Sequence, residues 1–272
     1  MPRIEKLDGP LTRWKLIDEG ASAELIPARG GLVTSFVVDG EELLFMDEAT
    51  LVDLSKNVRG GVPLLFPFAG KPPPGSTLPQ HGFARRSAWE VVSAVSDDDT
   101  ARLECVLRDD EQTRAAFPYA FEVRFSVSLF DARLMLEWEL SNRGAAPMPL
   151  HFGIHPYFRV GDKARVRVAG AEGRAFDNRA QQDREVTALD FSAGEVDLHF
   201  AAPPSAGTVL SRGGGRDVRL SWTPQFDTLV VWTLPGQPFV CVEPWTGRGG
   251  QPATRFIAAG QTERLAVELR RE

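Results

Sequence analysis

The chain is poor in cysteine and has no long apolar run. Its 272 residues include only two cysteines, Cys105 and Cys241, and both lie in apolar stretches typical of strands. Two buried, reduced thiols are therefore expected, and not a disulfide or a nucleophilic thiol. No apolar run is long enough to span a bilayer, and the first residues lack the apolar core of a signal peptide. These features predict a cytoplasmic protein that does not enter the membrane.

The chain also lacks an excess of basic residues. Its 31 Lys and Arg are outnumbered by 37 Asp and Glu, which gives a formal net charge of −6. This balance disfavours binding to nucleic acid or to an anionic membrane surface. The sequence contains neither the glycine pattern of a dinucleotide-binding fold nor that of a phosphate-binding loop. We therefore expect a small-molecule ligand, no cofactor, and a monomer or a homodimer.

Long segments with helical periodicity are lacking. Instead, apolar and polar residues alternate with a period of two along much of the chain. Every second residue is apolar from Phe121 to Leu129, and the pattern resumes from Leu134 to Leu140 after a turn at Asp131-Ala132. This arrangement predicts an antiparallel hairpin with one buried face. Similar strands are predicted at Ala23–Ile26, Leu32–Val38, Glu42–Met46, Trp89–Val95, Ala101–Leu107, Arg165–Val168, Val218–Trp222, Thr228–Thr233, Phe239–Val242 and Arg264–Leu269. Together they predict an all-β fold, a large antiparallel β-sandwich with few short helices, in a single domain over residues 1–272.

A few segments deviate from this pattern. Asp47 to Asn57 is predicted to form a turn or two of helix. Two stretches, Arg59 to His81 and Gly170 to Ala206, are predicted to be irregular. The first is rich in Pro and Gly and is a candidate rim loop, because long ordered loops often carry function. The triplet Gly213-Gly214-Gly215 is predicted to be a hairpin tip and not a phosphate cradle.

Histidine is scarce, and two of the four histidines lie in short stretches rich in Gly, Pro and aromatic residues. His155 precedes Pro156, which favours an extended backbone. Its side chain is either a proton donor in a site or a core histidine bonded to a backbone carbonyl. His151 lies four residues earlier, but residues four apart on a strand are separated by about 13 Å. Because no third ligand is evident, we expect no metal site.

Glu243 ends an apolar strand and directly precedes Pro244 and Trp245. Burial of a carboxylate costs free energy unless the group is hydrogen-bonded or its pKa rises. A raised pKa suits a general base near neutral pH. The alternative is a strand-end glutamate that pairs with an arginine such as Arg248.

Three further residues are candidate ligands for a polar small molecule. His81 either donates a hydrogen bond to a substrate oxygen or packs against Phe83. Arg59 precedes two glycines, which permit close approach of a ligand, and a surface ion pair is its alternative. Asp227 begins an apolar strand, where it either orients a substrate hydroxyl or caps a turn.

Four short motifs follow one another along the chain, and they are Arg59–Pro63, His81–Arg85, His155–Phe158 and Cys241–Trp245. In this order they resemble the aldose 1-epimerase (galactose mutarotase) superfamily. The run from Arg59 to Arg85 is also similar to the glucose-6-phosphate 1-epimerase branch. Since the motifs extend from Arg59 to Trp245, the resemblance covers most of the chain.

The resemblance implies a galactose mutarotase-like supersandwich with a sugar cleft, and a reaction that interconverts α and β anomers without cofactor or metal. It implies that Glu243 takes the proton from the anomeric O1 hydroxyl and that His155 protonates the ring oxygen. It also implies that His81 donates a hydrogen bond to the sugar, that Arg59 binds substrate, and that Asp227 orients a hydroxyl.

The resemblance leaves the substrate open between a free hexose and a hexose 6-phosphate. Arg59, Arg85 and Lys71 are the basic residues that would hold a phosphate, because guanidinium groups suit phosphate oxygens. The segment Pro244 to Gly247 is instead similar to branches known simply as aldose 1-epimerases.

Two other functions remain as alternatives. A non-catalytic carbohydrate-binding β-sandwich would not need Glu243 and His155 together. A glycoside hydrolase or lyase would use a pair of carboxylates, for which Glu243 and Asp227 are the candidates.

Overall fold

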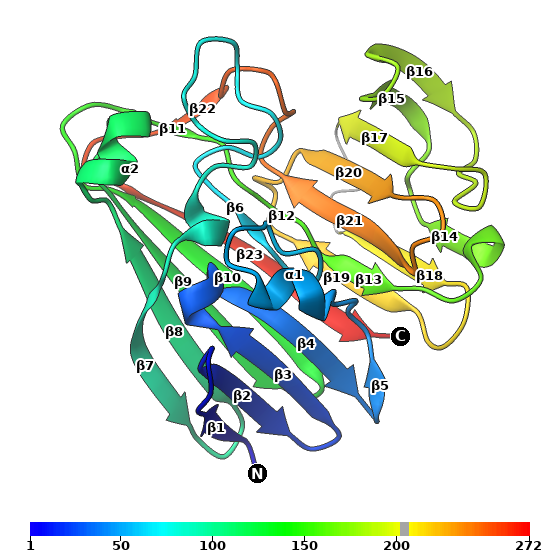
Figure 1. Cartoon of the computed structure of the whole chain (residues 1–272), viewed down its shortest axis with the longest axis horizontal. Helices are drawn as coiled ribbons and strands as arrows, with labels where there is room; N and C mark the ends of the chain where they lie inside the picture. Colours follow the sequence, from blue (N-terminus) through cyan, green and yellow to red (C-terminus); the bar gives the residue numbers. More distant parts are fainter. Residues whose placement is uncertain (202–206) are drawn as a thin grey trace.

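The computed structural model describes residues 1–201 and 207–272, and their named strands pair in antiparallel fashion (Figure 1). The N-terminal sheet has the order β1-β2-β3-β4-β5. Its strands are β1 (Arg3–Leu7), β2 (Arg13–Asp18), β3 (Ala21–Ile26), β4 (Leu32–Val38) and β5 (Glu41–Glu42). Of these, the sequence had indicated β3 and β4, and the predicted strand Glu42–Met46 overlaps β5 only at Glu42. Strands β1 and β2 were not predicted, because most of their residues are half-exposed or exposed.

A second sheet, called here the large sheet, has the order β14-β18-β19-β23-β10-β9-β8-β7. Its strands are β7 (Glu90–Ser96), β8 (Ala101–Arg108), β9 (Phe121–Phe130), β10 (Arg133–Asn142), β14 (Val166–Val168), β18 (Thr208–Arg212), β19 (Val218–Trp222) and β23 (Thr262–Arg271). The predicted hairpin is confirmed as β9 and β10, with Leu134 opposite Leu129. Its turn residues Asp131 and Ala132 both have positive φ, of 48° and 54°, as a tight hairpin requires.

A third sheet, called here the site sheet, has the order β16-β15-β17-β20-β21-β12-β6, with β13 also paired to β21. Its strands are β6 (Leu64–Leu65), β12 (Gly153–Ile154), β13 (Tyr157–Arg159), β15 (Gly173–Asp177), β16 (Gln182–Val186), β17 (Val196–Ala201), β20 (Thr228–Thr233) and β21 (Phe239–Trp245). Strands β11 (Met148–Leu150) and β22 (Arg255–Ile257) form a separate pair. In Figure 1 the N-terminal sheet lies in front of the large sheet, while β15, β16 and β17 lie at the opposite side of the molecule.

The core lies between these sheets because each strand presents apolar residues to one face. The stacked rings of Phe125 (β9) and Trp138 (β10) lie 5.1 Å apart, and both residues are buried. Strands β1, β2 and β3 pack against β7, β8 and β9, which makes the sandwich. The prediction of an antiparallel β-sandwich is thus confirmed.

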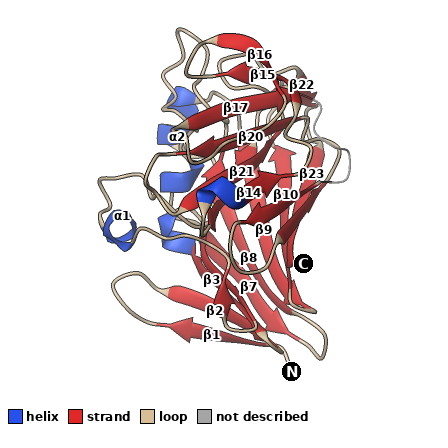
Figure 2. Cartoon of the chain, turned by 90° about the vertical axis from the view of Figure 1, so that its right-hand side faces the viewer, coloured by secondary structure: helices blue, strands red, loops and turns tan. Residues whose placement is uncertain are grey.

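Helices are few and short, as predicted. They are α1 (Glu48–Val52), α2 (Glu111–Ala116) and three 3₁₀ turns, η1 (Pro27–Arg29), η2 (Ala84–Arg86) and η3 (Lys163–Arg165). Figure 2 shows α1 and α2 to one side of the strands. No helix among the described residues is long and apolar enough to cross a membrane. Helix α1 confirms the helical turn predicted between Asp47 and Asn57, whereas α2 was not anticipated.

The prediction that Gly170 to Ala206 is irregular is wrong for three stretches of this segment. Strands β15, β16 and β17 all lie in it, whereas residues 202–206 lie outside the described part. The first four residues of β16 are exposed, so this strand carries no apolar alternation. Its backbone hydrogen bonds to β15 define it instead. The predicted hairpin tip at 213–215 is confirmed, since it joins β18 to β19.

Candidate active site

One face of the site sheet lines a cavity of about 700 Å³. In the register of β17, β20 and β21, His199 lies opposite Val230, and Val230 lies opposite Glu243. All three residues line the cavity. Directly opposed residues project to the same face of a sheet, so three neighbouring strands contribute to one wall. The alternate residues point the other way: Leu198, Val231 and Val242 belong to the hydrophobic core.

A close contact between two buried ionisable groups in the cavity joins His155 to Glu243. Nε2 of His155 lies 3.4 Å from Oε1 of Glu243, with side-chain exposures of 10% and 1%. The backbone N–H of His155 donates to the carbonyl of Pro63 at 2.9 Å. Its ring stacks on Tyr157 with centroids 4.6 Å apart and an interplanar angle of 11°. The imidazole is therefore held in place against a carboxyl group.

Burial shifts both of these groups toward their neutral forms. It raises the pKa of Glu243 well above the ordinary value, with a further contribution from Asp197, whereas Arg85 acts in the opposite direction. It lowers the pKa of His155 to about 3, and Arg85 adds to that shift. Burial disfavours the charged form of each group. The pair therefore holds one titratable proton in total over a wide pH range.

His81 is held beside this pair by an unusual backbone conformation. Its φ is +66°, and that of Gly82 is +68°. The backbone N–H of Gly70 donates to Nδ1 of His81 at 2.9 Å, so the ring proton of the neutral imidazole sits on Nε2. The His81 and His155 rings lie 5.6 Å apart. His81 thus presents a hydrogen-bond donor inside the cavity.

The glycine after His81 is required by close packing. A Cβ added to Gly82 would lie 2.1 Å from the carbonyl oxygen of Phe66. The backbone N–H of Phe83 donates to that same oxygen at 3.0 Å. The loop can therefore pass this close to β6 only with a glycine, and this contact fixes the position of His81.

Arg85 lines the cavity from the turn η2. Its Nη2 donates to the carbonyl of Gln80 at 2.9 Å. Its Nε is buried and has no hydrogen-bond partner among the described residues. Burial lowers the pKa of Arg85 to about 10, so the group is still cationic at neutral pH. A guanidinium in a cavity that has a free Nε–H and no ion-pair partner among the described residues is suited to an anionic ligand.

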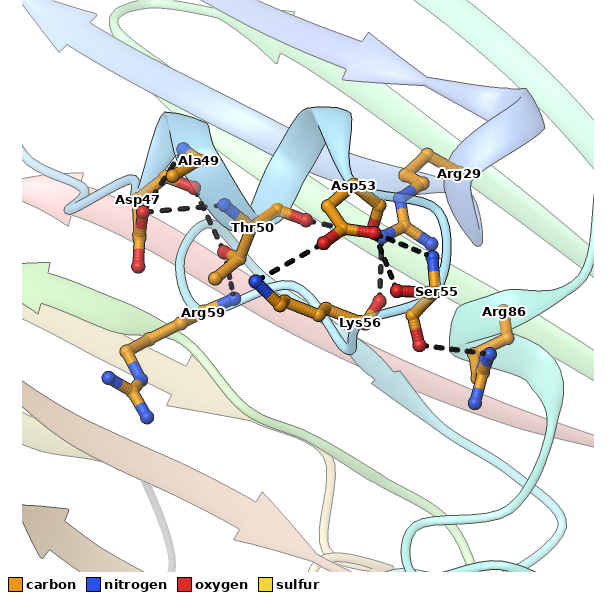
Figure 3. A network of polar contacts seen from close by, with 9 residues as sticks. All are labelled: Arg29, Asp47, Ala49, Thr50, Asp53, Ser55, Lys56, Arg59 and Arg86. Carbon is orange, nitrogen blue, oxygen red and sulfur yellow. Dashed lines mark hydrogen bonds and ion pairs between the residues drawn. The ribbon is translucent and has the colours of Figure 1, made fainter.

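Arg59 is not among the described residues that line the cavity. Its backbone is fixed by the loop that carries α1: its N–H donates to Oγ1 of Thr50, and its carbonyl accepts from the N–H of Asp47, both at 2.9 Å. Its guanidinium extends away from that loop (Figure 3). Asn57, two residues earlier, does line the cavity.

The loop around α1 is held by the buried side chain of Arg29. Its guanidinium donates to four backbone carbonyls, those of Thr50, Leu51, Asp53 and Lys56, at 2.7–3.2 Å. Figure 3 shows Arg29 with three of these residues, Thr50, Asp53 and Lys56. Four charge-assisted hydrogen bonds from one side chain make the loop rigid. The segment that leads to Arg59 therefore has a defined position.

Asp227 is likewise not brought to the cavity wall in the described part of the chain. Its carboxylate lies 3.3 Å from the guanidinium of Arg255, and Oγ1 of Thr228 donates to it at 3.1 Å. Asp227 precedes β20, at the end of the strand away from Trp232. It is thus an ion-paired residue at the strand start.

The sequence analysis missed two polar residues on β17. Asp197 and His199 both line the cavity, and Nε2 of His199 lies 3.2 Å from Oδ1 of Asp197. The signal was present, because polar Asp197 and His199 alternate with apolar Leu198 and Phe200. This alternation was overlooked because the stretch from Gly170 to Ala206 was predicted to be irregular.

Arg248 and Phe176 close another part of the cavity wall. The guanidinium carbon of Arg248 lies 3.7 Å from the centroid of the Phe176 ring, which is a cation–π contact. Its Nη1 is 4.0 Å from Oδ1 of Asp183, so Arg248 pairs with this residue and not with Glu243, as the alternative interpretation of Glu243 would require. Phe176 lies on β15, so the segment from 170 to 206 contributes a residue to the cavity wall.

His151 has a structural position and does not pair with His155 as a metal ligand. Its Nδ1 accepts from the N–H of Ala69 at 3.1 Å, and its Nε2 lies 3.3 Å from the carbonyl of Arg248. Both ring nitrogens are thus used to join two loops of the cavity rim. The potential metal ligands that do cluster among the described residues are His155, Cys241 and Glu243.

Comparisons with known proteins agree on the relatives of this chain. Residues 13–270 match the family described as "Aldose 1-epimerase". A protein of Escherichia coli (strain K12) named "Putative glucose-6-phosphate 1-epimerase" is 30% identical over 295 aligned positions, which cover 99% of this chain and 98% of the relative. One of Cenchrus ciliaris with the same name is 34% identical, and there the match spans 65% of this chain and 56% of the relative.

Solved structures are similar over nearly the whole length. The Slr1438 protein of Synechocystis sp. PCC 6803 has a TM-score of 0.91 at 31% identity, with 97% of this chain and 96% of that chain covered. A galactose mutarotase-like protein of Clostridium acetobutylicum has a TM-score of 0.83 over 100% and 98% of the two chains. Because the identity to this protein is only 16%, the similarity is evidence for the fold and not for the function. It confirms the predicted galactose mutarotase-like fold.

Proposed function

The chain belongs to the aldose 1-epimerase family, a family of isomerases, and from this premise we propose that it interconverts the α and β anomers of a hexose 6-phosphate. The observation that carries the proposal is the buried His155–Glu243 contact of 3.4 Å in a cavity large enough for a sugar. The relatives named as glucose-6-phosphate 1-epimerases support the choice of substrate.

The reaction requires one proton to leave O1 and another to reach the ring oxygen O5. We propose that Glu243 takes the O1 proton and that His155 delivers its proton to O5, so that the C1–O5 bond breaks and the open aldehyde forms. Rotation about C1–C2 exposes the other face of the aldehyde. The two residues then exchange roles as the ring closes, with no net change in protonation.

In this assignment the reactive pair is a minor, doubly charged form, because burial favours the neutral form of each group. Burial raises the pKa of Glu243, so its carboxylate is a stronger base than a solvated one. Burial lowers the pKa of His155, so its imidazolium is a stronger acid. The form that carries both charges is therefore the reactive one. A sugar that fills the cavity supplies the hydrogen bonds that water would otherwise give to these charges.

His81 and the β17 pair are the proposed positioning groups. The Nε2–H of His81 is available to donate to a sugar oxygen, because Nδ1 is engaged by Gly70. Asp197 and His199 line the cavity on the same face as Glu243 and offer further partners for hydroxyl groups. We also propose that Arg59 and Asp227 contact the substrate, which requires their side chains to reorient when the sugar binds.

A phosphate group would be held by the basic residues of the cavity wall. Lys71, Arg85 and Arg248 line the cavity. In a hexopyranose, C6 is attached to C5 and lies next to O5, so the phosphate belongs on the same side as His155. The charge of Arg85 acts on His155, and its Nε has no partner among the described residues. Arg85 is therefore the proposed phosphate ligand.

The two alternative functions have less support. A binding module would have no use for a buried carboxyl–imidazole pair. A hydrolase that used Glu243 with Asp227 would need both in the cavity, and Asp227 is paired with Arg255 instead. We also propose a cytoplasmic location, which the free and buried thiols of Cys105 and Cys241 support.

The test is anomer exchange measured by NMR magnetisation transfer on glucose 6-phosphate, glucose and galactose. We expect the largest acceleration over the spontaneous rate with glucose 6-phosphate. Rates equal to the spontaneous one for all three sugars would contradict the proposal, and a preference for a free hexose would refute its substrate.

A further inference from the structure

Cys241 lies directly behind the acid–base pair and has no part in the proposed reaction. It is fully buried on β21, opposite Trp232 on one side and Tyr157 on the other. One donor atom from each of His155, Cys241 and Glu243 lies within 4.8 Å of the other two. A sulfur, a nitrogen and an oxygen donor thus converge on one point at the base of the cavity.

This donor set matches the preferences of zinc. Zn²⁺ binds thiolate, imidazole and carboxylate at about 2.0–2.3 Å, and sites with three protein ligands leave a fourth position open. Ligand atoms in such a tetrahedral site lie about 3.3–3.6 Å apart. The His155 and Glu243 atoms are already 3.4 Å apart, so mainly the sulfur has to approach. A thiolate and a carboxylate would balance both charges of the cation.

The ligands are available and the surroundings favour a captured cation. Nε2 of His155 and Oε1 of Glu243 contact each other, and the other polar atom of each side chain, Nδ1 and Oε2, is buried without a hydrogen-bond partner in the described chain, so binding breaks few existing contacts. Cys241 packs with Tyr157 and Phe239 in an apolar cluster, which excludes water from the sulfur side. His155 and Glu243 line the cavity, and this provides the path of entry.

We propose that His155, Cys241 and Glu243 form an inhibitory site for Zn²⁺ and other thiophilic divalent cations. The cation occupies the carboxylate and the imidazole that the sugar requires, so it competes with the substrate. The inhibition rests on the proposed function, whereas binding of the cation does not. Binding releases to solvent both the thiol proton of Cys241 and the proton held by the His155–Glu243 pair, and it is reversed by a chelator.

Binding is tested with Co²⁺ as a spectroscopic substitute for Zn²⁺ on the full chain. We expect a thiolate-to-cobalt charge-transfer band that saturates at one equivalent and disappears when Zn²⁺ is added. Cys105 is the matched control, because it is also a free and buried thiol. The Cys105→Ser variant should keep the band, whereas Cys241→Ser and Cys241→Ala should both lose it. A wild-type protein without the band, or a band that survives in both Cys241 variants, would overturn the site.

Inhibition is tested by anomer exchange with and without Zn²⁺, each variant being compared with its own chelated form. The concentration of Zn²⁺ that halves activity should rise at least about tenfold in Cys241→Ser, and stay unchanged in Cys105→Ser. Equal sensitivity of all three proteins would refute the inhibitory role. A cobalt band with no loss of activity would uphold the cation site and contradict the catalytic roles of His155 and Glu243.

Discussion

Nε2 of His155 lies 3.4 Å from Oε1 of Glu243, and this contact joins strand β21 to the segment between β12 and β13. Among the described residues, neither side chain forms an ion pair with any other residue. The two groups therefore depend on each other, and a single proton shared between them decides which is acid and which is base.

The imidazole of His155 should remain neutral far below the pH at which an exposed histidine titrates. An unperturbed histidine has a pKa of about 6.5, whereas burial lowers the pKa of His155 to about 3. In an NMR titration, the His155 ring signals should not shift between pH 7.5 and 5. The His155 signals are identified as those that are missing from the spectrum of the His155→Gln variant. A midpoint near 6.5 would show that the ring is solvated or stabilised as a cation.

Arg85 should discriminate between phosphorylated and free sugars. Replacement by Met removes the guanidinium and is expected to lower kcat/KM for glucose 6-phosphate by about 10- to 100-fold, since a hydrogen bond to a charged group contributes about 1.5–3 kcal/mol. The value for glucose should change much less. Arg86, its exposed neighbour, provides the control variant Arg86→Met. Equal losses for both sugars with Arg85→Met would remove this residue from the phosphate site.

Gly82 should tolerate no side chain, because of its contact with Phe66. An added Cβ would lie 2.1 Å from the Phe66 carbonyl oxygen. Gly75 has a similarly positive φ of +86°, with nothing within 4 Å of an added Cβ. Gly75→Ala should thus cost only the conformational penalty of about 1–2 kcal/mol. Gly82→Ala should lower the free energy of unfolding by about 2 kcal/mol more, as measured by urea denaturation.

The same substitution should also reduce activity, because the strained loop places His81. A Gly82→Ala protein with wild-type stability and full anomer exchange would show that the close approach to Phe66 has no role in positioning this histidine.

Much of the fold could be predicted from side-chain alternation. The apolar series from Phe121 to Leu129 and from Leu134 to Leu140 corresponds to β9 and β10 almost residue for residue. The method fails where a strand has no buried face, as for β16. It also fails for α2, whose six residues are too few to show a helical period, although its cap, Asp110 with Thr113, was readable.

The candidate site was predictable only in part. His81, Arg85, His155 and Glu243 come together from three separate motifs, and local sequence together with the family resemblance indicated all of them. Asp197 and His199 escaped notice because their strand had not been recognised. For Asp227, a short motif could not indicate that Arg255 would lie beside it, since that contact depends on the placement of β22.

The most direct test of the account is the rate of anomer exchange of glucose 6-phosphate catalysed by Glu243→Gln. The amide keeps the shape of the buried side chain but cannot accept the O1 proton, so kcat should fall by about 10²–10⁴-fold while the thermal unfolding temperature is maintained. Glu185→Gln, at an exposed position of β16, should retain the wild-type rate. A folded Glu243→Gln protein with wild-type kcat would contradict the central claim that this carboxylate is the base.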